Sequence, residues 1–260
     1  MGREHIEFIE AGDVAAGDVT TGMLAGTTRR LLSEDDANGA STALHGLSAE
    51  WSGDLGAESA RPIELFVLTG AICVAGEAVG EGCYAFLPAG GAERSVSADG
   101  EAQVLVMIDP EREGASGGPA KIVDPSGERW LSADLGGADI PPGICIKLLH
   151  EDAETKDWTW VAATVPAWQE NRAEIHDTIE ECLMIRGDTL LGERGVMKPG
   201  SYFWRPPMVR HGPMFTHHGG YFFFRSKGGG LTVEYEAVPG WEKMIDDYIA
   251  SDSFYGGDLN

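Results

Sequence analysis

Two histidines and a glutamate are the residues of this chain whose types and spacing best fit metal chemistry. His176 is followed by Glu180 after three intervening residues, and His211 closes the stretch Pro206–His211. Neutral imidazole nitrogens and carboxylate oxygens are good donors to divalent transition metals. We therefore predict that His176, Glu180 and His211 bind one divalent ion. The competing interpretation is a hydrogen-bonded core histidine with a surface glutamate nearby.

A second carboxylate lies two residues before His176. Side chains alternate between the two faces of a strand, so Glu174 and His176 are expected on the same face. If His176 points into a barrel, Glu174 becomes a possible fourth ligand, and two carboxylates would neutralise the charge of a divalent ion. A carboxylate in water at the rim of the barrel fits the sequence equally well. Glu181, by the same alternation, should point outward and have a structural role.

Candidate catalytic groups are less well defined than the ligands. Glu174, Tyr202 and Arg225 are the candidates, because each could move a proton or hold a substrate oxygen near the metal. Arg205, Arg210 and Arg225 could hold a substrate carboxylate or enolate, although solvation at the surface is the preferred interpretation for any one of them. The expected apolar walls include Tyr202, Trp204, Met184, Met214 and Phe222. His217 and His218 precede a glycine pair and are expected in a hairpin turn, where one of them could reach the metal.

The spacing of these residues resembles the two sequence signatures of the cupin family, G-x5-H-x-H-x3,4-E-x6-G and G-x5-P-x-G-x2-H. His176, Glu180 and Gly187 fit the first signature, and Gly200, Pro206 and His211 fit the second. Glu174 replaces the first histidine, and Met208 replaces a glycine. The stretches His176–Glu181 and Pro199–Pro207 are similar to those of the ChrR-like and DUF4437-like cupins, over residues 4 to 235 or so. This resemblance implies β-barrels and a metal, and it leaves the reaction open.

An internal repeat covers most of the chain. The segment Arg30–Asp35 reappears as Lys147–Asp152, and Trp51, Glu64 and Gly70 reappear at the same offset of 117 residues as Trp168, Glu181 and Gly187. One inserted residue shifts the later pairs, such as Pro88 with Pro206. Two copies of one unit predict a bicupin, with a first domain at residues 1–112 and a second at 113–260. Ser59, Ile63 and Glu93 occupy the ligand positions in the first copy, so we expect that barrel to be degenerate and metal-free.

Short apolar segments ending at glycines support an all-β fold of two tandem cupin barrels, each a double-stranded β-helix or jelly roll. The expected strands include 62–70, 104–109, 158–161, 180–187 and 221–225. The glycine-rich segment 110–121 is the expected linker. One amphipathic helix is predicted at Gly240–Ile249, with apolar residues in the i, i+3, i+4, i+7 pattern packing on a barrel wall.

Composition limits the possible partners. The formal net charge of −23 argues against nucleic-acid binding, which needs a basic surface. The distribution of charged and apolar residues indicates neither a secretion signal nor a membrane span. The four cysteines lack metal-finger spacing and suggest reduced thiols in a cytoplasmic protein. A homodimer is expected, because pairing would cover sheet edges.

The sequence therefore favours a metal-dependent enzyme that acts on a small organic molecule. A non-haem Fe(II) oxidoreductase of dioxygenase type is the preferred reading, because two histidines and a carboxylate leave open positions on the metal. A lyase or isomerase using Zn(II), Mn(II) or Ni(II) would need the same ligands. A ligand-binding or sensory cupin without turnover is the third alternative.

Overall fold

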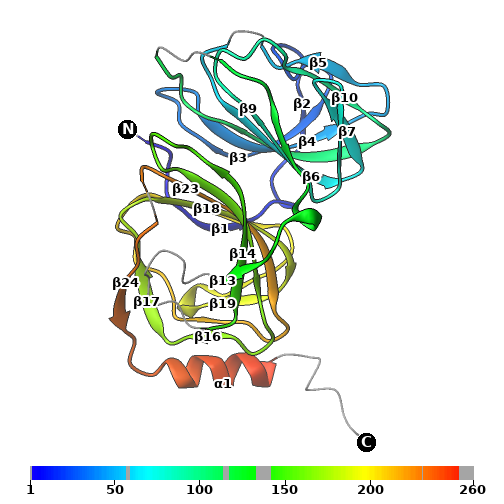
Figure 1. Ribbon diagram of the computed structural model, residues 1–260. Helices are drawn as coiled ribbons and strands as arrows, with labels where there is room; N and C mark the ends of the chain where they lie inside the picture. Colours follow the sequence, from blue (N-terminus) through cyan, green and yellow to red (C-terminus); the bar gives the residue numbers. More distant parts are fainter. Residues whose placement is uncertain (1, 57–58, 114–116, 133–141, 230, 252–260) are drawn as a thin grey trace, which may run out of the picture. The chain divides into compact units, whose positions relative to one another are not determined.

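Short strands, many of them ending at glycine turns, are the main regular structure of the chain, and they form two units (Figure 1). The structure is a computed structural model that describes residues 2–56, 59–113, 117–132, 142–229 and 231–251. The first unit comprises Met1–Glu4 and Ala11–Glu128, and the second comprises His5–Glu10 and Arg129–Asn260.

The first unit contains two antiparallel sheets. The larger sheet has the order β12-β9-β6-β11-β4-β3-β2, and the smaller has the order β5-β10-β7-β8. The strands are β2 (Gly17–Asp18), β3 (Thr28–Glu34), β4 (Ser41–Leu47), β5 (Ser52–Asp54), β6 (Ile63–Thr69), β7 (Ala71–Val74), β8 (Glu77–Gly80), β9 (Tyr84–Leu87), β10 (Ser95–Ala98), β11 (Ala102–Ile108) and β12 (Lys121–Val123). Alternate residues of β6, such as Ile63, Leu65 and Val67, contribute to the aliphatic core of this barrel.

The second unit repeats this plan. Its larger sheet has the order β1-β21-β18-β23-β15-β14-β13, a four-stranded sheet has the order β16-β22-β19-β20, and β17 pairs with β24. The strands are β1 (Ile6–Glu10), β13 (Leu131–Ser132), β14 (Ile144–Glu151), β15 (Trp158–Thr164), β16 (Gln169–Glu170), β17 (Arg172–Ile175), β18 (Ile179–Gly187), β19 (Thr189–Leu191), β20 (Val196–Met197), β21 (Ser201–Arg205), β22 (Met214–Phe215), β23 (Gly220–Lys227) and β24 (Glu234–Ala237). Aromatic and sulfur-containing side chains dominate its core.

The repeat expected from the sequence is present in the structure. The strand order β3-β4-β11-β6-β9 of the first unit matches β14-β15-β23-β18-β21 of the second. Tyr84 donates a hydrogen bond to Glu64 at 2.7 Å, and the repeated pair, Tyr202 and Glu181, is joined by the same bond at 2.5 Å. The expected fold class, two tandem β-barrels with a short C-terminal helix, is confirmed.

The boundary between the units differs from the expected division at residue 112. Strand β12 follows that position, yet it pairs with β9 of the first unit. Strand β1 begins near the N-terminus, yet it pairs with β21 of the second unit, with Ile6 opposite Trp204 and Ile9 opposite Tyr202. The first unit thus extends through β12 to Glu128, and β1 supplies backbone partners to a unit whose other residues begin at Arg129. The segment 110–121 therefore does not mark the domain boundary.

The predicted helix is confirmed as α1 (Trp241–Ser251). Ile245 is its most buried residue and packs with Leu190 and Phe215. Tyr248 donates a hydrogen bond to Asp188. This helix therefore covers the smaller sheet of the second unit, as the amphipathic pattern predicted.

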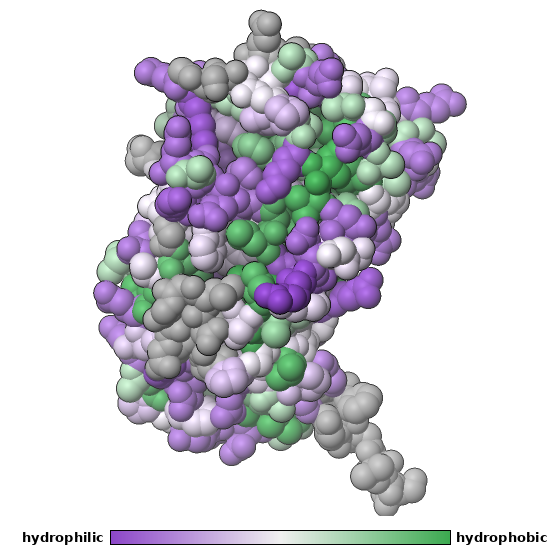
Figure 2. Space-filling model, viewed as in Figure 1, coloured by the Kyte–Doolittle hydropathy of each residue, from purple (hydrophilic) through white to green (hydrophobic). Residues whose placement is uncertain are grey.

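The surface matches the charged composition. Hydrophilic residues cover much of the face shown in Figure 2, between smaller hydrophobic patches. Trp130, Val165 and Met208 are the large hydrophobic side chains that are exposed in the described part of the chain. The four cysteines are free thiols. Of the helices in the described ranges, none is long and apolar enough to cross a membrane.

Gly187, which ends β18, should tolerate no side chain. Its φ is +85°, and an added Cβ would lie 1.9 Å from the carbonyl oxygen of Gly219. Gly187→Ala should therefore destabilise the protein by about 3 kcal/mol or more, measured by chemical denaturation. Gly200 is a matched control, since its φ is +97° but an added Cβ meets nothing within 4 Å. Gly200→Ala should cost only the conformational strain, about 1–2 kcal/mol. Equal losses would contradict this explanation.

Candidate metal centre

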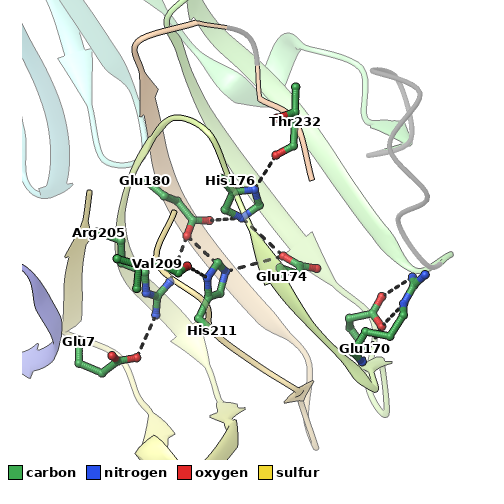
Figure 3. Close-up of polar contacts among 10 residues, drawn as sticks. Glu7, Glu170, Glu174, His176, Glu180, Arg205, Val209, His211 and Thr232 are labelled. Carbon is green, nitrogen blue, oxygen red and sulfur yellow. Dashed lines mark hydrogen bonds and ion pairs between the residues drawn. The ribbon is translucent and has the colours of Figure 1, made fainter. Parts of the chain in front are cut away.

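Backbone pairing places the predicted ligands together in the second unit. Glu174 lies on β17, and its backbone forms two hydrogen bonds with His211, of 2.8 and 3.1 Å. The backbone N–H of Met208 donates to the carbonyl of His176 at 2.8 Å, which ties the loop before His211 to the end of β17. Glu180 follows on β18 after a short turn. Two segments distant in sequence are thus held in one register, with their side chains in the barrel interior (Figure 3).

Met208 stands where the cupin signature has glycine. Its φ of +68° is in the left-handed region, which costs an L-residue about 1–2 kcal/mol. The backbone shape of the signature is therefore kept even though its glycine is absent. The Met208 side chain is exposed, so it takes up no space in the packed interior.

The donor atoms have the spacing of a metal site. One donor atom from each of Glu174, His176 and His211 lies within 4.8 Å of the other two. Oε2 of Glu174 is 3.7 Å from Nε2 of His176 and 3.8 Å from Nε2 of His211. These distances exceed hydrogen-bond length, but atoms about 2 Å from a shared ion would be separated in this way. The three side chains are buried.

The outer nitrogens of both histidines are engaged, which fixes the tautomers. Nδ1 of His176 lies 2.7 Å from the carbonyl oxygen of Thr232, and Nδ1 of His211 lies 3.2 Å from that of Val209. A carbonyl can only accept, so each Nδ1 donates its proton, and in a neutral imidazole the Nε2 then keeps the lone pair that binds a metal. Nε2 of His176 is buried without a hydrogen-bond partner. A buried nitrogen without a hydrogen-bond partner, with carboxylate oxygens of Glu174 and Glu180 at 3.7 and 3.8 Å, fits a ligand of an ion that would lie between these donors.

Glu180 lies beside the same centre and also contacts a cation. Its Oε1 is 3.8 Å from Nε2 of His176, and its Oε2 is 3.5 Å from Nε2 of His211. The guanidinium of Arg205 donates to Oε2 at 3.0 Å, and its other end lies 3.8 Å from Glu7 on β1 (Figure 3). Glu180 is thus held between the two imidazoles and Arg205. It is placed to ligate the ion or to position the histidines.

Burial and neighbouring charges shift the pKa values of Glu174 and Glu180 in opposite directions. Burial raises the pKa of Glu174 to about 8, with a further contribution from the negative charges of Glu180 and Glu170. Burial also acts on Glu180, but the two histidines and Arg205 hold the pKa of Glu180 below its usual value. Burial lowers the pKa of His211 to about 4. The metal-free site is therefore expected to hold a neutral His211, an anionic Glu180 and a protonated Glu174 at neutral pH.

The centre opens into a cavity of about 140 Å³ in the interior of the second unit. Glu174, His176, Glu180, His211 and Arg205 all line it. The remaining lining is mainly apolar and aromatic, and includes the predicted wall residues Met214 and Phe222. A polar cluster at the edge of an apolar hollow is the usual form of a small-molecule site.

Comparison with known proteins agrees with this fold. Residues 8–232 match the profile of a family described as a domain of unknown function, DUF4437. The chain belongs to this family. A search of the curated proteins found no match.

Solved structures resemble this DUF4437 protein over most of its length. A protein from Nostoc punctiforme with a provisional dioxygenase assignment is 22% identical, with a TM-score of 0.75, over 91% of this chain and 92% of that one. A provisionally assigned glyoxylate-induced protein from Pseudomonas aeruginosa is 13% identical, with a TM-score of 0.66, over 90% and 93%. A mutant of salicylate 1,2-dioxygenase from Pseudoaminobacter salicylatoxidans is 10% identical, with a TM-score of 0.54, over 76% and 74%. At these identities the similarity gives the fold, which is the bicupin fold.

Two catalytic candidates from the sequence lie away from the cavity. Arg225 donates to Oε2 of Glu181 at 2.9 Å, and Tyr202 donates to Oε1 of the same carboxylate. Glu181 points to the opposite face of β18 from Glu180, as predicted, and neither Tyr202 nor Arg225 is among the described residues that line the cavity. Trp204 shares the face of Tyr202. In this DUF4437 chain, Tyr202 and Arg225 are therefore structural partners of Glu181 and do not face the cavity, contrary to the prediction that they are catalytic.

Of the remaining polar candidates, one lines the cavity and the others lie outside it. Arg205 lines the cavity, whereas Arg210 pairs with Glu236 at the surface. His217 and His218 lie in the turn before β23, as predicted, and their backbone N–H groups donate to Asp188. Neither histidine is among the described lining residues of the cavity. The sequence did not indicate Glu7 or the carbonyl of Thr232, because a carbonyl has no sequence signal and β1 lies far from the motif.

In the first unit of this DUF4437 chain, the described core encloses a much smaller space. Ile63, at the position equivalent to Glu180, is fully buried in the aliphatic core, as predicted. Ser59 lies in a turn, where its carbonyl accepts from Arg94 at 3.3 Å, and Glu93 is exposed. The described core residues leave an interior cavity of only about 10 Å³, which is at the lower limit for a single water. Chemistry inside a barrel is therefore assigned to the second unit.

Proposed function

We propose that this protein is a divalent-metal-dependent enzyme that transforms a small organic molecule in the barrel of its second unit. A non-haem Fe(II) oxidoreductase of dioxygenase type is the activity that we favour. The observation that supports it most strongly is the buried group of Glu174, His176 and His211 at the edge of an apolar cavity. Two histidines and one carboxylate form the ligand set of many non-haem Fe(II) oxygenases and leave coordination positions open.

The residues of the site have distinct parts in this proposal. Glu174, His176 and His211 would hold the ion, which when bound would supply Lewis acidity and, if it is iron, redox chemistry. Arg205 keeps the Glu180 carboxylate anionic beside the histidines. The aromatic and aliphatic walls exclude water from the reacting groups. The provisional dioxygenase assignment of the similar Nostoc punctiforme protein agrees with this proposal.

A lyase or isomerase without redox chemistry is the second candidate, and one observation favours it. Both Glu174 and Glu180 lie beside the histidines, so a four-ligand set would occupy a position that dioxygen would otherwise use. Zn(II) or Mn(II) would accept the same mixed nitrogen and oxygen donors.

Oxygen dependence separates the two candidates. Protein is loaded with Fe(II) under anaerobic conditions and then mixed with each member of a panel of diketones and hydroxyketones. With an active compound it should consume dioxygen, and conversion of that compound should stop when oxygen is removed. Zn(II)-loaded protein and His176→Ala should consume none. Equal conversion with and without oxygen would replace the dioxygenase proposal with the lyase or isomerase. Tight ligand binding without conversion under any metal would indicate a binding protein.

A further inference from the structure

Aromatic rings that pack on one another form part of the cavity wall. Trp160 stacks on Phe224 with ring centres 5.4 Å apart and an angle of 10° between the planes. Phe222 lies 5.6 Å from Phe224, and Trp158 meets Trp160 edge-on at 6.4 Å. Rings held by their neighbours cannot move aside easily in a close-packed interior. The shape of the cavity is therefore largely preformed.

Charge is confined to one end of this cavity. Among the described lining residues, Arg205 is the one arginine or lysine. Its guanidinium already bonds Glu180 and lies 3.6 Å from the Phe203 ring centre. A ligand with a second carboxylate, directed away from the metal, would bury that charge among rings without a partner. Burying an unpaired charge is strongly unfavourable, so the ligand should carry polar groups at one end only.

The volume limits the other end of the ligand. The cavity measures about 140 Å³, and an apolar protein cavity of about 150 Å³ is known to take up benzene. One six-membered ring therefore fits, whereas two fused rings would force the packed aromatic wall apart. Overpacking of this kind is destabilising in a preformed interior.

We propose that the site selects molecules with one metal-chelating polar end and one apolar group about the size of a single aromatic ring. The chelating end rests on the proposed function, and the size limit rests on the cavity itself. Small dicarboxylates and fused-ring compounds are excluded for different reasons, the first by charge and the second by volume.

Three hydroxamates with the same chelating group test this proposal on the Co(II)-loaded protein: acetohydroxamate, benzohydroxamate and 2-naphthohydroxamate. Binding is measured twice, by the Co(II) absorption spectrum and by fluorescence of the wall tryptophans Trp158 and Trp160. Benzohydroxamate should bind about tenfold tighter or more than acetohydroxamate, because its ring is buried. 2-Naphthohydroxamate should bind at least about tenfold more weakly than benzohydroxamate. Equal affinities, or tightest binding of the naphthyl compound, would overturn the proposal.

Two variants test the size limit by changing the cavity, one by filling it and one by enlarging it. Ala162 lines the cavity on β15, and Ala162→Leu should remove the preference for benzohydroxamate over acetohydroxamate. Leu191→Ala should enlarge the cavity and raise the affinity for 2-naphthohydroxamate. Ala163 is adjacent to Ala162 but outside the lining, so Ala163→Leu should keep the wild-type ranking. An unchanged ranking in both cavity variants would overturn the size limit.

The two readouts separate this inference from the proposed function. Failure of the protein to take up Co(II) would contradict the proposed metal-dependent enzyme. The tryptophan fluorescence would still rank the three compounds by the size of their apolar group, and that ranking supports or overturns the size limit without reference to the metal.

Discussion

Replacing His176 or His211 with alanine is expected to lower the affinity for a divalent ion by more than about 100-fold. Loss of an outer partner of a metal ligand typically costs 10- to 100-fold, so loss of a direct ligand should exceed that range. Both imidazoles are buried and direct Nε2 at the same point beside Glu174. Competition with a chromophoric chelator gives the dissociation constant, and elemental analysis gives the occupancy. The wild-type protein should hold one ion per chain.

His218→Ala is the matched control for this experiment. His218 belongs to the same unit, but it lies in the turn before β23, where its ring is 3.4 Å from Asp188. Its replacement should leave the metal affinity within about twofold of the wild-type value, since surface changes away from a site usually have small effects. Unchanged metal occupancy in His211→Ala, or two ions per wild-type chain, would contradict the assigned ligands.

Metal binding is expected to release about one proton per ion below pH 8. Glu174 has a pKa of about 8 in the metal-free site because it is buried beside Glu180, so it is protonated below that pH. It must lose this proton to become a ligand. His211, with a pKa of about 4, is already neutral and has no proton to lose at pH 6 to 8. Affinity should therefore rise about tenfold for each pH unit up to about 8 and then level off.

Calorimetric titration in buffers of different ionisation enthalpy measures this proton directly. Glu174→Gln retains the shape of the side chain but cannot ionise, so its binding should release no proton from this position. Its affinity should be lower than that of the wild type and nearly independent of pH from 7 to 8. Proton release by Glu174→Gln equal to that of the wild type would show that Glu174 is not the group that titrates.

Part of the candidate site could be predicted from the sequence, where local geometry determines the direction of a side chain. Glu174 and His176 share a face through strand alternation, and Gly187 marks a turn where backbone atoms approach too closely for a side chain. Trp51 and Trp168, at the same offset, are both buried. The alternation and the turn depend on neighbouring residues, and the repeat depends on a constant offset. All three can therefore be recognised from the sequence alone.

The direction of Tyr202 and Arg225 could not be predicted in the same way. Every residue of β21 is buried, and β23 is apolar on both faces. Such strands show no alternation of apolar and polar residues, so the sequence does not reveal which side chains face the cavity. The structure resolves the ambiguity, since Phe203 and Arg205 line the cavity while Tyr202 bonds Glu181.

The unit with which each edge strand pairs could not be predicted from local sequence patterns either. Strand β1 pairs with β21, and Glu7 on β1 lies near Arg205 although most of the chain separates them. Pairings between distant segments leave no periodic signal in either segment. For this reason the expected domain boundary at residue 112 was misplaced, and Glu7 was absent from the predicted site.

Anomalous diffraction from crystals of the Co(II)-loaded protein, recorded on both sides of the cobalt absorption edge, tests the central claim most directly. We expect one strong peak per chain, about 2 Å from Nε2 of both His176 and His211 and in contact with Glu174. A peak in the first unit near Ile63, or no peak between the two imidazoles at full metal loading, would contradict the assignment of this site.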